Sequence, residues 1–391
     1  MKLAKDDPIL IIGGGIAGIS TAVALQYYEF TNIHIYERAE TLPVYPVPVQ
    51  LGANVLVALS DLTLAEVVQG VAMPWQQLTW HASNGKILKE VDISPITEAS
   101  GFAPVNITYP ELHRILKREL PDTSFHLGEE LVSYTLGEDI VEAHFASGTT
   151  QECALLIGAD GLNSRIRLQL MGRTEIRRDG RRGYHALVER GFLDQADHPA
   201  FSQPQREYWG LDKLCVLAAQ SELNASISLY APAPKLPPQS LSKWLHNEFQ
   251  DWESPIPEII EQVAESAWQS DEVADFAPIK NWYDWRVVLV GDAAHAAYPY
   301  LGQSIGMSIE SGITLARTIH EHSKKLERAF KKYQKLRRSR TKTATKAAFK
   351  RAESMSVNSK IAYSLRNAIM PKLPGFLEEK SFLKLNKERY Y

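Results

Sequence analysis

The sequence predicts an α/β fold that combines a parallel sheet, an inserted antiparallel sheet and a C-terminal helical segment. Three observations lead to this prediction. A short apolar run near the N-terminus ends in a glycine-rich turn, two later apolar runs end in Gly-x-Asp or Gly-Asp, and the segment between those two runs alternates in polarity. With 391 residues the chain is long enough for two or three domains, or for one large unit with an inserted domain.

The N-terminal pattern is that of a βαβ unit. Residues 9–12 (ILII) form an apolar run that ends at Gly13, which is typical of a buried parallel strand. Residues 18–25 (GISTAVAL) have the spacing of a packed helix, and residues 33–37 (IHIYE) form a second strand pattern. A strand, a helix and a strand in this order predict two neighbouring parallel strands.

Two later strand patterns add to this sheet. Residues 153–160 (CALLIGAD) and 286–292 (RVVLVGD) place glycine and aspartate at the carboxyl ends of strands, the edge where open α/β sheets bind ligands. The region 181–275 is rich in Trp, Tyr and Pro and alternates, as in ASISLYAP, which predicts an antiparallel sheet. We therefore expect a discontinuous parallel-sheet domain (1–75, 100–180 and 276–345), an antiparallel-sheet domain (76–99 and 181–275) and a C-terminal helical tail (346–391).

The chain from residue 315 onward has a different composition. Up to Glu353 it lacks Gly and Pro and carries apolar residues at helical spacing, which predicts a long helix. Between Ser323 and Arg351 there are 13 Lys or Arg and a single acid, Glu327. This basic stretch is either a solvated helix face or a docking surface for an acidic partner or a membrane.

The bulk composition excludes several classes of protein. A formal net charge of -3 argues against general nucleic-acid binding. Cys153 and Cys215 lie far apart without CxxC spacing, so we expect neither a disulfide framework nor a metal site, and a reducing cytoplasm fits this usage. No apolar run reaches the ~20 residues of a membrane-spanning helix, and the N-terminus lacks the pattern of a secretory signal.

The first glycine motif, GGGIAG, places Gly13, Gly15 and Gly18 in the pattern GxGxxG. Here the first glycine permits a tight turn, the second lets the backbone approach a pyrophosphate, and the third permits close packing of helix on strand. The N–H groups at the start of the helix would face the phosphates. Glu37 ends the next strand, where its carboxylate can accept hydrogen bonds from both ribose hydroxyls of an adenosine. The predicted dinucleotide site comprises Gly13, Gly15, Ile16, Ala17, Gly18, Glu37 and Arg38.

The second motif, GADGLNSRIR at residues 158–167, also follows a predicted strand. Asp160 lies at the carboxyl end of that strand, and Arg165 and Arg167 add positive charge suited to a pyrophosphate. Alternatively, Asp160 only caps the helix that begins near Ser164.

Together with GDAAH at residues 291–295, these motifs resemble those of the single-component FAD-dependent aromatic hydroxylases, the para-hydroxybenzoate hydroxylase-like flavoprotein monooxygenases of group A. Members of that family carry GxGxxG near the N-terminus, an Asp-Gly motif near the middle, and Gly-Asp with Pro-x-x-Gly-Gln in the last third. All three occur here in that order, and the resemblance covers about residues 8–345. It implies a Rossmann-like FAD-binding domain and a substrate-binding antiparallel domain. The matching residues of the middle motif, which would serve flavin and nicotinamide nucleotide, are Asp160, Gly161, Ser164 and Arg167.

The third motif would then surround the flavin ring. Asp292 ends a strand, where its carboxylate can accept hydrogen bonds from ribityl hydroxyls, and Pro299 stiffens the loop beside the ring. After Gln303 the chain turns into a helix whose first N–H groups would stabilise negative charge at the flavin's pyrimidine edge. His295 either orients this loop or packs in the core. The residues expected to contact the flavin here are Gly291, Asp292, Pro299, Gly302, Gln303, Ser304 and Ile305.

Two features depart from the family pattern. Where family members usually read Gly-Gln-Gly-x-Asn, this chain has Ser304 and Gly306 at the third and fifth positions, and we expect Ser304 to cap the helix. Tyr109 occupies the place of a frequent arginine, and no arginine follows Arg38 in TLPVYPVPVQ. Because these arginines tend to serve nucleotide phosphates, two electron sources stay open: NADH or NADPH directly, or a separate flavin reductase.

The resemblance implies a FAD-dependent monooxygenase that takes electrons from NAD(P)H, activates O₂ as a flavin C4a-hydroperoxide and hydroxylates an aromatic or polyketide-like small molecule. Two alternatives stay open: a flavin-dependent oxidase or reductase without oxygen insertion, and a flavin-binding scaffold whose basic tail recruits a partner. No catalytic base is assigned, and the oligomeric state is left open. The residues considered for the reaction centre or the pocket wall are His295, Pro299, Tyr208, Tyr184, His185, Trp209 and Tyr230.

Overall fold

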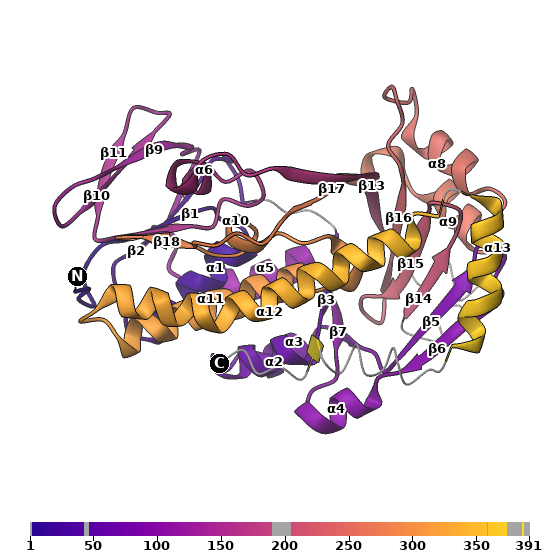
Figure 1. Cartoon of the computed structure of the whole chain (residues 1–391), viewed down its shortest axis with the longest axis horizontal. Coiled ribbons are helices and arrows are strands. Elements are labelled where there is room, and N and C mark those ends of the chain that lie inside the picture. Colours follow the sequence, from indigo (N-terminus) through magenta and orange to yellow (C-terminus); the bar gives the residue numbers. More distant parts are fainter. Residues whose placement is uncertain (1, 43–46, 190–204, 358, 374–384, 387–391) are drawn as a thin grey trace.

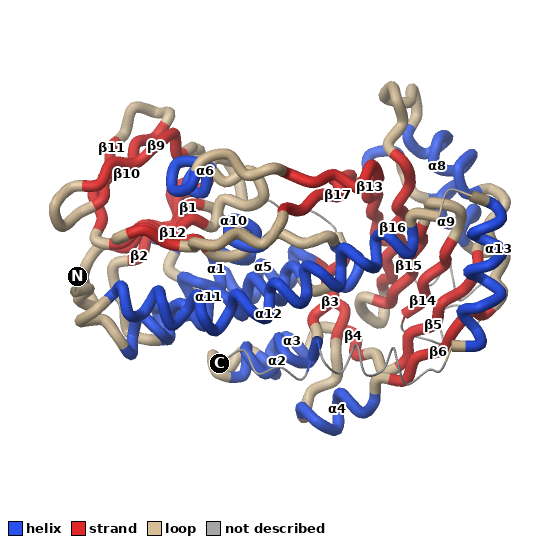
Figure 2. The backbone as a smooth tube through the Cα atoms, in the orientation of Figure 1, coloured by secondary structure: helices blue, strands red, loops and turns tan. Residues whose placement is uncertain are grey.

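Two large sheets lie at opposite ends of the molecule, and a long C-terminal helix runs from one to the other (Figures 1 and 2). The structure is a computed structural model that describes residues 2–42, 47–189, 205–357, 359–373, 385 and 386. It confirms the predicted α/β class, with a parallel sheet, an antiparallel sheet and a helical C-terminal segment.

The first sheet contains the predicted parallel strands. Its strands are β1 (Ile9–Ile12), β2 (Ile33–Glu37), β8 (Phe125–Leu127), β12 (Leu155–Gly158), β18 (Tyr283–Asp284) and β19 (Val287–Leu289). They lie in the order β18-β19-β12-β1-β2-β8, and all neighbours pair in parallel except the antiparallel edge strand β18. Every residue of β1 is buried, as expected of a parallel strand covered on both faces.

This sheet is covered by helices on one side and by a small meander on the other (Figure 1). The helices are α1 (Ile16–Tyr27) and α11 (Ser304–Glu321), which pack directly against each other. The meander strands are β9 (Leu131–Leu136), β10 (Val141–Phe145) and β11 (Thr150–Cys153). Both layers belong to one hydrophobic core together with β1 and β12.

The second sheet has seven strands in the order β17-β13-β16-β15-β14-β5-β6. They are β5 (Gln77–Ala82), β6 (Ile87–Asp92), β13 (Ile176–Glu189), β14 (Gln205–Trp209), β15 (Leu214–Ala219), β16 (Asn224–Pro232) and β17 (Gln269–Phe276). All neighbours are antiparallel except β14 and β5, so the predicted antiparallel sheet is confirmed. Both segments predicted for this domain, 76–99 and 181–275, contribute strands, while the domain limits themselves remain a prediction.

One face of the second sheet packs on two helices, α8 (Leu241–Phe249) and α9 (Ile256–Gln262), and forms a separate core with them. Several short elements lie in the chain between β2 and β8: β3 (Pro48–Leu51), β4 (Met73–Pro74), β7 (Val105–Thr108), α2 (Ala53–Ser60), α3 (Ala65–Gln69), α4 (Ser94–Ser100) and α5 (Tyr109–Arg118). Ile96 of α4 packs in one cluster with Leu88 of the second sheet, while Leu112 of α5 belongs to the core of the first sheet. The remaining short elements are α6 (Arg165–Met171), α10 (Asp292–His295) and the 3-10 turns η1 (Asp122–Ser124), η3 (Glu265–Ala267), η4 (Pro299–Leu301) and η5 (Met370–Lys372).

The basic stretch forms α12 (Leu326–Met355), followed by α13 (Lys360–Ile369). α12 continues unbroken across the domain limit expected at 345/346. Part of its positive charge points inward, because Arg337 and Arg340 are buried against α11. The interpretation as a solvated face therefore holds only for the exposed basic residues of the helix, Arg328 among them. In the described ranges no helix has both the length and the apolar character needed to cross a membrane.

Candidate functional site

The turn between β1 and α1 has the geometry that the GxGxxG motif predicts. Gly13 has a φ of 114°, and a Cβ there would collide with the carbonyl of Ala159, the residue that follows the neighbouring strand β12. A Cβ at Gly18 would collide with the Gly13 carbonyl, so this glycine lets α1 pack close to the turn. Gly15 has open space, with only the Tyr109 hydroxyl 3.6 Å from the place of a Cβ. A ligand can therefore approach the backbone closely at Gly15.

A nucleotide-sized cavity of about 720 Å³ opens beside this turn, at the carboxyl ends of β1, β2 and β12. Glu37 lies on its wall, and two backbone groups hold its carboxylate. The N–H of Gly14 donates to Oε2 over 2.8 Å, and the N–H of Ala39 donates to Oε1 over 3.0 Å. We call this space the nucleotide cavity; its lining residues include Ile12, Gly13, Gly15, Tyr36, Glu37, Arg38, Glu129, Ala159, Asp160, Gly161, Asn163 and Arg165.

Asp160 caps α6, which is one of the two roles considered from the sequence, while its binding of a nucleotide remains a prediction. Its Oδ2 accepts hydrogen bonds from the N–H groups of Arg165 and Ile166, at 2.7 and 3.2 Å, and so caps α6. Its Oδ1 is buried and has no hydrogen-bond partner within the described residues. Burial raises the pKa of Asp160, against the opposing effect of these N–H donors. A buried oxygen normally accepts a hydrogen bond, so a ligand hydroxyl or N–H is the expected donor to Oδ1 on this cavity wall. A dinucleotide carries such donors.

Arg167 lies elsewhere than the pyrophosphate site that the sequence suggested. Its side chain is buried, donates from Nη1 to the carbonyl of Ala293 over 3.1 Å and from Nη2 to that of Leu162, and stacks on Phe276. It therefore ties α6 to α10 and is absent from the described lining of the nucleotide cavity. Arg165, two residues earlier, points into that cavity because it lies on the opposite side of the first turn of α6.

The predicted flavin loop begins at Gly291, which follows β19 and lies against α1. Gly291 has a φ of 64°, and a Cβ there would lie 2.5 Å from Cβ of Ala17, so only glycine allows this approach. Asp292 follows as the first residue of α10, and burial raises its pKa. The Ser304 hydroxyl donates to Oδ1 of Asp292 over 3.0 Å, which links the two ends of the loop.

Two expectations for this loop change. Ser304 does not cap α11, because it is the first helical residue and its hydroxyl is bonded to Asp292 instead; the N-cap is Gln303, which makes no side-chain capping bond. Gly306 departs from the family pattern for a packing reason. A Cβ at this position would lie 2.5 Å from Cγ2 of Val55, so α2 and α11 touch here and leave no room for an asparagine.

His295 is a packing residue, which was one of its two expected roles. Its Nε2 lies 2.8 Å from the Ser311 hydroxyl, and its ring lies 5.2 Å from that of Trp282. Burial lowers the pKa of His295 to about 3, and the positive charge of Arg337 adds to this effect. A neutral histidine held inside the core is not placed to exchange protons with a ligand.

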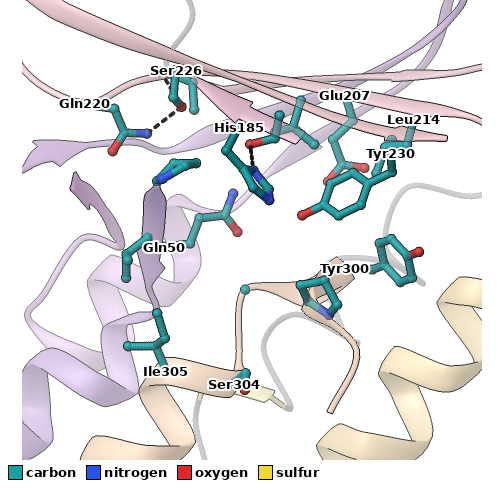
Figure 3. A pocket seen from close by; sticks show the side chains of 17 residues that line it. Gln50, His185, Glu207, Leu214, Gln220, Ser226, Tyr230, Tyr300, Ser304 and Ile305 are labelled. Carbon is teal, nitrogen blue, oxygen red and sulfur yellow. Dashed lines mark hydrogen bonds between the residues drawn. The ribbon is translucent and has the colours of Figure 1, made fainter. Parts of the chain in front are cut away.

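A second cavity, of about 140 Å³, lies between the antiparallel sheet and the segment 299–305 (Figure 3). We call it the substrate cavity. Its volume is close to that of the roughly 150 Å³ cavity known to hold a benzene molecule in another protein. Its lining residues are Pro48, Val49, Gln50, His185, Glu207, Leu214, Val216, Ala218, Gln220, Ser226, Ser228, Tyr230, Pro299, Tyr300, Gly302, Ser304 and Ile305.

The period of two along each strand decides which side chains reach the substrate cavity. On β16, Ser226, Ser228 and Tyr230 face the cavity, while Ile227 and Leu229 face the α8–α9 core. His185 and Tyr230, both considered from the sequence, thus lie on the wall. Pro299 also lines it, beside the flavin loop.

Three other candidates are wrong as wall residues. Tyr184 and Tyr208 point to the opposite face and pack in the core formed with α8 and α9. Trp209 is buried at the end of β14 against Trp80, their rings 5.1 Å apart. Glu207, which no sequence pattern singled out, lies on the wall in place of Tyr208, because adjacent strand residues face opposite sides. Alternation along the strand tells which side chains share a side with Tyr208. It would have indicated Glu207 only if the side that faces the cavity had been known.

Comparison with known proteins gives a consistent picture. Residues 6–189 match the family described as FAD binding domain. The chain is 27% identical over 332 residues to an Aurachin C monooxygenase/isomerase of Stigmatella aurantiaca, covering 84% of each protein. It is 25% identical over 333 residues to a 6-hydroxynicotinate 3-monooxygenase of Pseudomonas fluorescens, covering 82% of this chain and 84% of that protein. It is 26% identical over 338 residues to a salicylate hydroxylase of Pseudomonas putida, covering 79% and 76%.

Solved structures share the fold over nearly the whole chain. Klebsiella pneumoniae HpxO complexed with FAD and uric acid superposes with a TM-score of 0.87 at 21% identity, covering 97% of both chains. A salicylate hydroxylase substrate complex superposes with a TM-score of 0.74 at 19% identity, covering 98% of both chains.

Proposed function

We propose, because this chain belongs to the family of FAD-dependent aromatic hydroxylases, that it binds FAD across its two cavities and hydroxylates a small aromatic molecule in the substrate cavity. The enzyme is a FAD-dependent monooxygenase, and NADH or NADPH is the co-substrate typical of its family. Bound FAD supplies the redox chemistry: it accepts electrons from the nucleotide and activates O₂ for transfer of one oxygen atom.

The nucleotide cavity would hold the adenosine and the pyrophosphate. Glu37 is already oriented by two backbone N–H groups, so its remaining lone pairs can accept hydrogen bonds from ribose hydroxyls. The N-terminus of α1 presents unpaired N–H groups beside Gly15, where a pyrophosphate would be stabilised by the helix dipole. Arg38 and Arg165 add positive charge on the same wall. Oδ1 of Asp160 could accept a hydrogen bond from a hydroxyl of the cofactor.

The ring end of the cofactor would lie along the loop from Gly291 to Ile305. Asp292 can accept hydrogen bonds from ribityl hydroxyls with the lone pairs that Ser304 does not use. The first N–H groups of α11 have no side-chain cap, so they remain available to stabilise negative charge on a bound ring. Pro299 and the left-handed Gly302 (φ of 61°) set the course of the loop between these points.

The observation that carries this proposal is the substrate cavity, which is bounded on one side by the flavin loop (Figure 3). Leu214, Val216 and Ala218 form an apolar floor on β15, and Tyr230 and Tyr300 approach each other edge-on with ring centroids 5.2 Å apart. Such walls favour a flat apolar ring and limit the access of water, which would otherwise favour loss of the activated oxygen as peroxide.

The test is reduction and turnover of the purified protein. We expect a flavin absorbance spectrum, anaerobic bleaching by NADH or NADPH that an aromatic ligand accelerates, and ¹⁸O from ¹⁸O₂ in the hydroxylated product. Reduction without ¹⁸O incorporation would replace hydroxylation by oxidase or reductase chemistry. Bound flavin that neither nucleotide reduces would instead point to a separate flavin reductase. Tyr109, in place of an arginine, favours this second source of electrons.

Location in the cytoplasm is part of the proposal. Cys153 and Cys215 are free and buried, and burial raises the pKa of the Cys153 thiol to about 12, so neither is poised for disulfide exchange. This cysteine chemistry suits a reducing compartment.

A further inference from the structure

We propose that the substrate cavity selects an uncharged, single-ring aromatic molecule with an N–H or O–H donor, and that Glu207 accepts the hydrogen bond from this donor. The inference deepens the proposed function, on which it rests, by naming the class of substrate. It depends on the charges around the cavity and on two hydrogen-bond acceptors in its wall.

The described part of the cavity wall offers no lysine or arginine to a substrate carboxylate. Both ring nitrogens of His185 are engaged: Nδ1 lies 2.9 Å from the Ser228 hydroxyl, and Nε2 lies 2.9 Å from Oδ1 of Asp271. Moving a carboxylate from water into a cavity where no cation pairs with it costs much free energy. Carboxylated rings should therefore bind poorly.

Two arginines that contact residues of the cavity wall, Arg351 at Glu207 and Arg181 at Tyr300, are already paired. Arg351 bonds to Oε2 of Glu207 through Nη2, and its guanidinium lies 4.4 Å from the ring centroids of both Trp80 and Trp209. Arg181 bonds to Asp179 over 2.7 Å and is buried. Recruiting either cation for a ligand would leave a buried carboxylate unpaired, which is unfavourable.

Glu207 is held as an acceptor facing the cavity. The indole N–H of Trp209 donates to Oε2 over 3.0 Å, and Arg351 bonds to the same oxygen. Figure 3 shows the carboxylate beside Tyr230 and Leu214, directed into the cavity. Oε1 is then the oxygen that an N–H or O–H of a ligand would reach, and a charged acceptor makes the stronger hydrogen bond.

A second acceptor lies at the other end of the same sheet face. The side-chain Nε2 of Gln220 donates to the Ser226 hydroxyl over 2.8 Å, while its Oε1 is buried with no partner in the described part of the chain. In Figure 3, Gln220 and Glu207 lie on opposite sides of His185. Among the residues that the structure describes, two acceptors and no available cation match a ring that donates hydrogen bonds and carries no negative charge.

The hydrogen bond to Glu207 also has a chemical consequence. When a ring N–H or O–H donates to a carboxylate, electron density moves into the ring, which favours attack on an electrophilic oxygen. Glu207 would therefore affect turnover as well as binding. A residue that only supports the fold would not distinguish a donor-bearing ligand from its N-methylated form.

The test measures ligand affinity for the FAD-loaded enzyme, by calorimetry and by perturbation of the flavin spectrum. Two matched pairs differ only in a carboxylate: phenol with 3-hydroxybenzoate, and 2-pyridone with 6-hydroxynicotinate. We expect each uncharged ring to bind at least about tenfold more tightly than its carboxylate, which is a difference of about 1.4 kcal/mol. A third comparison, 2-pyridone with 1-methyl-2-pyridone, isolates the N–H donor, and we expect about tenfold tighter binding of the former.

Glu207→Gln should abolish most of the preference for 2-pyridone over its N-methyl form, whereas the exposed control Glu222→Gln should leave it unchanged. Equal or tighter binding of either carboxylate, or of the N-methyl ligand, by the wild type would overturn the inference; these comparisons need no variant. Hydroxylation of 3-hydroxybenzoate with ¹⁸O incorporation would also overturn it while supporting the proposed function. Absence of ¹⁸O in product from a ring that binds as expected would overturn the function alone.

Discussion

Arg337 and Glu310 form a fully buried ion pair in which Nη2 donates to Oε2 over 2.6 Å. Arg340 bonds to the same carboxylate, and Asn54 donates to Oε1 over 2.6 Å. Burial opposes ionisation of Glu310, but the two guanidinium groups outweigh it and hold the pKa of Glu310 at about 2. The cluster joins α11, which follows the flavin loop, to α12 and α2. Part of the basic stretch of α12 thus serves to position the loop.

Removing Arg337 should destabilise the fold strongly. In Arg337→Met, Glu310 stays buried with one cation fewer, and loss of a partner from a buried pair costs about 3–5 kcal/mol. The exposed Lys335→Met on the same helix should change the free energy of unfolding by less than about 0.5 kcal/mol. Denaturant unfolding of the FAD-loaded proteins measures both, and equal midpoints would contradict a structural role for the pair.

His295 predicts a specific dependence of stability on pH. Its pKa falls from 6.5 to about 3 on folding, so the unfolded chain binds the extra proton between these values and stability declines as pH falls below 6.5. At pH 5 this amounts to about 2 kcal/mol. His295→Gln should lose that contribution to the pH dependence, so its unfolding free energy should approach that of the wild type as pH falls from 7.5 to 5. A constant difference between the two proteins would show that His295 does not titrate in this way.

The contact at Gly306 can be tested by a double-mutant cycle. Gly306→Asn restores the residue usual in the family but pushes a Cβ against Val55, and overpacking of this kind costs about 1–3 kcal/mol. Val55→Ala removes the colliding methyl groups and should recover much of this loss in the double variant. Additive losses in thermal unfolding would mean that the two side chains do not compete for space.

Replacing Asp292 should weaken FAD binding more than replacing Ser304, whose hydroxyl donates to Asp292. Asp292→Ala would lose charge-assisted hydrogen bonds to ribityl hydroxyls, each worth about 1.5–3 kcal/mol, and weaken FAD binding by at least about tenfold. Ser304→Ala removes only the 3.0 Å hydroxyl bond and should have the smaller effect. Flavin content after gel filtration and titration of the apoprotein provide the measure. A fully loaded Asp292→Ala protein would argue against this placement of the ring.

The local pattern of residues determined the parallel sheet and its nucleotide turn. β1, α1 and β2 could be predicted because apolar periodicity and glycine are short-range signals, and the collisions at Gly13 and Gly18 arise within one turn of chain and its neighbouring strand. The antiparallel nature of the second sheet was also visible from alternation. The alternation did not indicate which face of that sheet lies against the flavin loop.

Only the tertiary structure decided the composition of the substrate cavity. Successive side chains along a strand point to opposite faces of the sheet. Tyr208 therefore lies in the core while Glu207 reaches the cavity, although the two are adjacent in sequence. The sequence suggested a pyrophosphate site for Arg167 and a solvated face or docking surface for the stretch that contains Arg337. The structure buries both side chains, because their partners, Ala293 and Glu310, are distant along the chain. Charge and polarity are properties of single residues, whereas burial and partners depend on how remote segments pack. The sequence therefore determined the cofactor fold, and packing decided the chemistry of the pocket.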